Sequence, residues 1–127
     1  MAMTRVQKIA AAAAAAALLA SPFEGRKFPP YYDPPGILTV CDGHTGADVV
    51  KNQTYTPAQC DKFMTDDMRH AVTAVEVCAP GVPQSVLIAF GDAVYNMGPT
   101  IACNTSRSTA ARFLKTRQWA DACRQLP

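Results

Sequence analysis

The sequence has little of what metal sites and nucleic-acid-binding surfaces require. It contains no C-x-x-C pair, and its two histidines, His44 and His70, do not stand at the intervals of a zinc finger. The net charge is only +2 over 127 residues, which is too weak to indicate a nucleic-acid partner. No internal repeat is present. We therefore expect no metal and no nucleic acid, and a single domain rather than a repeat array.

Cysteine, in contrast, is plentiful for so short a chain. Five cysteines are more than a reduced cytosolic protein usually carries, and their number favours disulfides formed in an oxidising compartment. The odd count leaves at least one thiol without a partner in the chain. The cysteines are Cys41, Cys60, Cys78, Cys103 and Cys123.

The N-terminal segment has the layout of an export signal. Arg5 and Lys8 precede an uncharged stretch over residues 9–23 that includes eight consecutive alanines. As a helix this stretch would span roughly 22 Å, short of the roughly 30 Å hydrocarbon core of a bilayer. The segment could be cleaved after a small residue such as Ala17 or Ala20, or be retained as a releasable anchor. We expect retention, because cleavage after Ala20 would leave Glu24, a candidate catalytic acid, close to the new N-terminus.

Residues 26–55 are rich in proline, glycine, tyrosine and β-branched residues, which predicts a small antiparallel sheet with tight turns. A helix should begin after Thr56, because Pro57 suits the first helical position and Gln59 completes a capping box. Its apolar residues recur every three to four positions until Pro80 and Gly81.

A second helix is predicted from near Pro83 to Met97, and because it is apolar on most faces it should be the buried central helix. Ser106 or Ser108 can cap a third helix, and residues 119–126 indicate a further helical turn or two. The order of elements predicts an α+β fold: an N-terminal helix, a small antiparallel sheet, and a mainly helical lobe separated from the sheet by a cleft.

Glu24 and Glu76 are the only glutamates, and Glu24 stands where the apolar N-terminal helix meets the sheet. An apolar wall would raise the pKa of its carboxyl group and keep it protonated. Asp33 follows in a turn, where it should stay ionised. A protonated acid facing an ionised carboxylate is what glycosidic hydrolysis requires, although two acids flanking a loop are more often an exposed turn.

The surrounding residues strengthen this interpretation. The runs Glu24-Gly25, Tyr31-Tyr32-Asp33-Pro34, Gly36 to Cys41 and Gly43-His44-Thr45-Gly46 closely resemble the catalytic region of the phage-type lysozymes, glycoside hydrolase family 24. In that family the acid, an aspartate and a threonine have the intervals of Glu24, Asp33 and Thr39. A threonine on a strand is otherwise mostly a β-former.

The resemblance implies a lysozyme-like fold and hydrolysis of the β-1,4 bonds between N-acetylmuramic acid and N-acetylglucosamine in peptidoglycan, leading to lysis of the host cell. Glu24 would protonate the leaving oxygen, while Asp33 and Thr39 would position and activate water with inversion. It implies no cofactor. His44 is expected to be a hydrogen-bonded structural residue, and Asn96 either lines the sugar groove or ends its helix.

The resemblance also implies disulfides between Cys41 and Cys60 and between Cys78 and Cys103. The N-terminal segment resembles that of signal-anchor-release endolysins, so we expect a monomer exported to the periplasm and initially tethered to the inner membrane. Residues 1–22 would be the anchor and residues 23–127 the catalytic domain.

In the family a further helical section, with a cysteine that would partner Cys123, follows the region matched here, so we expect the catalytic domain to be incomplete at its C-terminus. The alternative is a decayed, membrane-tethered remnant that binds peptidoglycan with weak or no turnover. An enzyme should release reducing ends from peptidoglycan, whereas a binding module should leave it intact.

Overall fold

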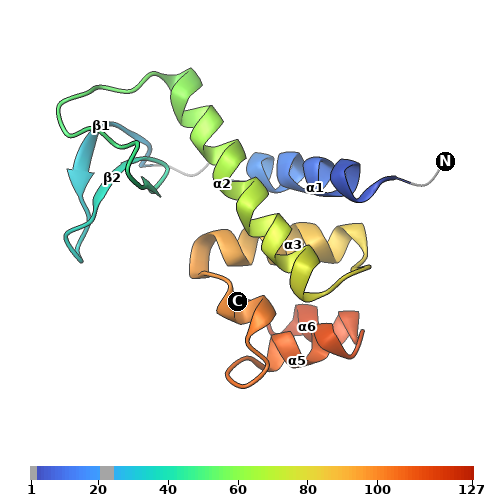
Figure 1. The fold of residues 1–127 in the computed structure, drawn as a ribbon. Coiled ribbons are helices and arrows are strands. Elements are labelled where there is room, and N and C mark those ends of the chain that lie inside the picture. The colour runs from blue at the N-terminus through green and yellow to red at the C-terminus, as the bar shows by residue number, and fades with distance from the viewer. Residues whose placement is uncertain (1–2, 21–24) are drawn as a thin grey trace.

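Helix α2 connects a small sheet to a larger group of helices in the computed structural model, which describes residues 3–20 and 25–127 (Figure 1). The expected α+β arrangement and its order are confirmed. The elements are α1 (Arg5–Ala20), β1 (Lys27–Tyr32), β2 (Leu38–Cys41), β3 (His44–Thr45), α2 (Pro57–Cys78), α3 (Gln84–Met97), α4 (Thr100–Cys103), α5 (Thr109–Lys115) and α6 (Trp119–Arg124).

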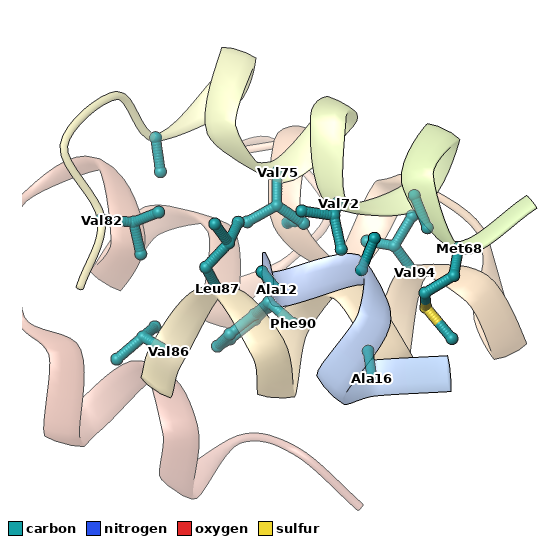
Figure 2. Close-up of a cluster of buried hydrophobic side chains, with 14 of the residues drawn as sticks. Ala12, Ala16, Met68, Val72, Val75, Val82, Val86, Leu87, Phe90 and Val94 are labelled. Carbon is teal, nitrogen blue, oxygen red and sulfur yellow. The ribbon is translucent and has the colours of Figure 1, made fainter. Parts of the chain in front are cut away.

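Helix α1 owes its stability to alanine, the best helix former, and to a reciprocal cap at its start. The Gln7 N–H donates to Thr4 Oγ1 at 3.1 Å, and the Thr4 N–H donates to Gln7 Oε1 at 2.9 Å. The small side chains of one face let α1 approach α2 and α3 closely, so that it forms part of the main core (Figure 2). The buried alanines are Ala12, Ala13, Ala16 and Ala20.

Within the described ranges, no helix combines the length and the apolar character needed to cross a bilayer. The expected boundary between an anchor ending at residue 22 and a domain beginning at residue 23 lies outside the described residues.

The sheet is antiparallel, in the order β1-β2-β3, as predicted. Tyr31 pairs with Thr39, and Thr39 pairs in turn with Thr45, so Thr39 lies on the central strand. The register shifts between Lys27 and Tyr31, where Pro29 and Pro30 have no N–H to donate. The pairing is therefore irregular at the proline pair, whereas Tyr31 and Tyr32 pair in regular register with Thr39 and Leu38.

The two long helices begin where the sequence predicts. Thr56 caps α2 with the full capping box, in which its side chain accepts from the Gln59 N–H. Helix α3 follows Pro83 and carries Leu87 and Phe90, both with no exposed surface. Its predicted role as the buried central helix is confirmed, since it packs on α1 and α2 (Figure 2).

Ser108, and not Ser106, caps α5, because its Oγ accepts from the Ala111 N–H at 3.1 Å. The short helix α4 was not predicted. The structure contains the two disulfides that the family resemblance implied, Cys41–Cys60 and Cys78–Cys103. Cys123 forms no disulfide with the described part of the chain.

Candidate functional site

A cavity of about 240 Å³ lies between the sheet and the helices, where the sequence predicts a cleft. Glu24, the predicted acid, lies outside the described residues. Ala20 and Gly25, which flank the segment containing Glu24, both line the cavity. Its lining is Ala20, Gly25, Arg26, Tyr31, Cys41, Asp42, Gly43, Met64, Tyr95 and Asn96.

A second hollow of about 490 Å³ adjoins the first at Gly43 and Tyr95. It extends along α2 past Asp67 and His70 and reaches Pro99, which directly precedes α4. Together the two hollows are bordered by the β2–β3 turn and by α2 and α3.

Asp33 and Thr39 are brought together through the backbone of Ile37. The Ile37 N–H donates to Asp33 Oδ1 at 2.7 Å, and Thr39 Oγ1 donates to the Ile37 carbonyl at 2.9 Å. Asp33 is half-buried and Thr39 is 3% exposed. Neither residue lines the cavity, but Tyr31, the strand partner of Thr39, does.

Arg26 joins three segments beside the cavity, a role that the sequence did not reveal. Its guanidinium contacts both carboxylate oxygens of Asp42, with Nη2–Oδ2 at 2.7 Å and Nε to each oxygen at 3.0 Å, and Nη1 lies 2.8 Å from Asp61 Oδ1. The hydrogen bonds that Arg26 donates to Asp42 outweigh the opposing effect of burial and raise the pKa of Arg26. The one available signal was the Cys41–Cys60 pairing that the family resemblance implies, since Asp42 follows Cys41 and Asp61 follows Cys60.

Tyr95 of α3 binds the backbone of Asp42, in the turn between β2 and β3. Its hydroxyl donates to the Asp42 carbonyl at 3.0 Å. Burial, and secondarily the charge of Asp42, raises the pKa of Tyr95 to about 12, so the phenol stays protonated and remains a donor. The neighbouring Asn96 lines the cavity while its amide donates to the Asp92 carbonyl at 2.9 Å.

His44 connects β3 to α2. Its Nδ1 lies 2.7 Å from Asp67 Oδ2 and its Nε2 lies 2.8 Å from Asp48 Oδ1. The ring stacks on Phe63 with centroids 3.9 Å apart. Although burial lowers the pKa of His44, hydrogen bonds and charges from Asp67 and Asp48 raise it above its ordinary value. Both ring nitrogens are thus occupied, which leaves neither free to act as a base.

No group of His, Cys, Asp and Glu side chains in residues 3–20 and 25–127 is arranged to hold a metal ion.

Solved structures define the class of this fold. The muramidase domain of SpmX from Asticaccaulis excentricus superposes with a TM-score of 0.73 at 20% identity, over 87% of this chain and 74% of that one. The active form of the P1 phage endolysin Lyz superposes with a TM-score of 0.72 at 20% identity, over 87% and 67% of the two chains. The fold is lysozyme-like.

The particular family follows from sequence. The sequence model of the phage lysozyme family matches residues 21–127, and the chain belongs to that family. Relatives named SAR-endolysin from Bacteriophage PS119 and Bacteriophage PS34 are each 36% identical over 107 residues, which is 81% of this chain and 60% of theirs. The chain thus spans about 60% of the length of these curated relatives.

Proposed function

We propose that this chain is a peptidoglycan-hydrolysing endolysin that cleaves the β-1,4 bonds between N-acetylmuramic acid and N-acetylglucosamine and so lyses the host cell. The observation that carries the proposal is the family match over residues 21–127, because that range includes Glu24, Asp33 and Thr39 at the family's intervals. The two adjoining hollows, which share Gly43 and Tyr95, support a polymeric substrate.

Glu24 is the proposed general acid. Ala20 and Gly25, the described residues on either side of its segment, line the cavity, and the helix before it is apolar. A carboxyl group beside such a wall loses hydration, which favours the protonated form that can donate to a leaving glycosidic oxygen.

Asp33 is the proposed base for the attacking water. Ile37 occupies its Oδ1, while Oδ2 has no hydrogen-bond partner among the described side chains and backbone groups and can accept a proton from water. The Thr39 hydroxyl donates its hydrogen bond to the Ile37 carbonyl. The lone pairs of Thr39 Oγ1 therefore remain to accept a hydrogen bond from the same water. Water activated opposite the acid attacks the anomeric carbon, and the configuration inverts.

Glu24→Gln tests this assignment. The amide keeps the size of the side chain but cannot protonate the leaving oxygen, so release of reducing ends from purified peptidoglycan should fall by at least about 100-fold. Asp66→Asn, which alters an exposed carboxylate on α2, is the matched control and should keep parental activity. A folded parent that binds peptidoglycan without releasing reducing ends would favour the non-catalytic remnant.

We also propose that the chain acts as a monomer in the periplasm and reaches it through its N-terminal segment, first held in the inner membrane. The support is the order of charges and apolar residues in that segment and the name SAR-endolysin of the relatives. The full chain should therefore sediment with inner membranes during expression and appear in the periplasmic fraction after collapse of the membrane potential. Recovery from the cytoplasm alone would contradict the proposal.

A further inference from the structure

The turn between β2 and β3 has a cysteine at a position where the backbone is left-handed. Cys41 has φ +60°, and Arg117 is the one other described residue besides the glycines with a positive φ. The Gly43 N–H donates to the Val40 carbonyl at 3.2 Å, so Cys41 is the first of the two central residues of a tight turn. Turns with a positive φ at that position mostly have glycine, asparagine or aspartate there. Cys41 therefore holds a conformation that its own β-carbon disfavours.

The disulfide with Cys60 opposes that preference. It joins Cys41 to the start of α2, and both residues are buried in the core cluster that the sheet shares with that helix. Helix α2 is itself capped by Thr56 and packs on α1 and α3. The backbone of residue 41 therefore cannot relax towards a negative φ without straining the covalent link or displacing a long helix.

The conformation of Cys41 sets the direction of the two residues that follow it. The Asp42 carbonyl accepts from the Tyr95 hydroxyl of α3 at 3.0 Å, and the Asp42 carboxylate binds Arg26. Gly43 lines both hollows, and Cys41 and Asp42 line the smaller one. Because peptide units are planar, a change of φ at residue 41 would rotate the following peptide as a whole and disturb both contacts of Asp42. The wall between the two hollows thus depends on one backbone torsion.

We propose that Cys41 is a positioning residue for the two hollows: its disulfide with Cys60 holds residue 41 in the left-handed conformation and thereby fixes the 42–43 turn that lines them. The disulfide does for this turn what a glycine would do without a crosslink. The inference rests on the proposed function for its effect on catalysis. Its structural half, the restraint of the turn, does not depend on turnover.

A disulfide can also act only by lowering the conformational entropy of the unfolded chain, with no local effect on a site. The two roles differ in which residue can replace Cys41. Glycine adopts φ +60° without strain, whereas alanine does not. If the torsion matters, glycine should restore the turn in the absence of the crosslink. If only the crosslink matters, glycine and alanine should be equally poor replacements.

The test compares two double variants of the full chain that both lack this disulfide. The glycine variant combines Cys41→Gly with Cys60→Ala, and the alanine variant combines Cys41→Ala with Cys60→Ala. The matched control, Cys78→Ala with Cys103→Ala, removes the other disulfide, whose residues line neither hollow. Circular dichroism establishes the folded fraction at the assay temperature. Soluble peptidoglycan fragments then give kcat/KM, and amide hydrogen exchange reports on the Gly43 N–H.

In the alanine variant kcat/KM should fall by about 10- to 100-fold, and exchange of the Gly43 N–H should accelerate by about tenfold, because the turn relaxes. In the glycine variant both quantities should stay within about threefold of the parent. The glycine variant should also melt at a higher temperature than the alanine variant, since glycine bears no strain at this torsion. The control should melt below the parent but keep the parental kcat/KM and Gly43 exchange.

Equal Gly43 exchange in the two folded double variants overturns the inference even if the parent has no activity. Failure of the glycine variant to fold overturns it as well, because the crosslink would then do more than hold one torsion. An alanine variant that does not fold beside a folded glycine variant agrees with it. A parent that releases no reducing ends, while the alanine variant alone loosens Gly43, refutes the proposed function and leaves the restraint of the turn established.

Discussion

The side chains of Thr39 and Asp33 both hydrogen-bond to the backbone of Ile37. Thr39 Oγ1 donates to the Ile37 carbonyl at 2.9 Å, and Asp33 Oδ1 accepts from the Ile37 N–H at 2.7 Å. The Asp33 N–H also donates to the Ile37 carbonyl, at 3.0 Å. The turn between β1 and β2 thus sets the spacing of both proposed water-binding residues, and that carbonyl keeps a donor if the threonine hydroxyl is removed.

Thr39→Val should consequently separate catalysis from stability. Valine preserves the shape and the strand preference of threonine but removes the oxygen that would hold water, so reducing-end release should fall by about 100-fold. The melting temperature should fall by only a few degrees, because the Ile37 carbonyl retains the hydrogen bond from the Asp33 N–H.

Thr39→Ser is the control, since it keeps the hydroxyl and loses one methyl group; it should retain most of the activity. Full activity in Thr39→Val would remove Thr39 from the proposed mechanism.

The contact of His44 with Asp67 and Asp48 should make stability depend on pH. The fold raises the pKa of His44, so the native state favours its protonated form. The stabilisation is then complete below the ordinary pKa of about 6.5 and is lost as the pH rises through the raised value.

His44→Gln should lower the free energy of unfolding by about 1–3 kcal/mol at low pH, the range expected for charged hydrogen bonds, and the difference from the parent should shrink in alkaline solution. Denaturant unfolding at several pH values measures it. His70→Gln, which changes an exposed histidine on α2, provides the comparison. If the difference in unfolding free energy between the parent and His44→Gln grew with pH, protonation of His44 would not stabilise the fold.

The elements were predictable because their signals are local. A capping box, a proline at a helix start and a glycine-proline stop act over a few residues, and so α2 and α3 begin and end close to the expected positions. Helix α4 escaped prediction because it has four residues, too few to show a hydrophobic period.

The side-chain connections around the site could not be predicted in this way. Lys8 and Glu76, like His44 and Asp67, come into contact only after segments distant in sequence have packed together. The hydrophobic periodicity of the sequence does not predict such contacts. The acids at positions 42 and 61 were the exception in principle, because an assumed disulfide between their neighbours already brings them together. The family resemblance supplied residue intervals for Asp33 and Thr39 but not their shared contact with Ile37.

Glu76 should be the electrostatic attachment point of α1. Its side chain is only 5% exposed, and Lys8 Nζ lies 2.9 Å from Oε2. Lys8 lies closer to this buried carboxylate than Arg5 does, so removing the lysine would leave the charge without its main partner.

Lys8→Met, which keeps the aliphatic stem but removes the charge, should lower the free energy of unfolding by about 3–5 kcal/mol, since it leaves a buried carboxylate without its main partner. Arg5 Nε, at 3.9 Å from Oε1, can offset part of that loss. Lys62→Met, which breaks an exposed pair, should cost less than about 1 kcal/mol. Equal effects of the two substitutions, measured by denaturant unfolding, would refute a special role for Glu76.

Gly91 sets the distance between α2 and α3. A methyl group at this position would lie 2.5 Å from Val72 Cγ2, and Val72 is fully buried. In a helix valine has one strongly preferred rotamer, so its side chain cannot turn aside without strain.

Gly91→Ala should therefore destabilise the protein by about 1–3 kcal/mol, even though alanine is the better helix former by about 1 kcal/mol. Val72→Ala removes the methyl groups that clash, at the cost of a cavity in the parent background. In the double variant the inserted methyl group would occupy part of that cavity, so the two losses should be less than additive by denaturant unfolding. Additive losses, or a gain in stability from Gly91→Ala alone, would mean that α2 and α3 do not approach each other through this glycine.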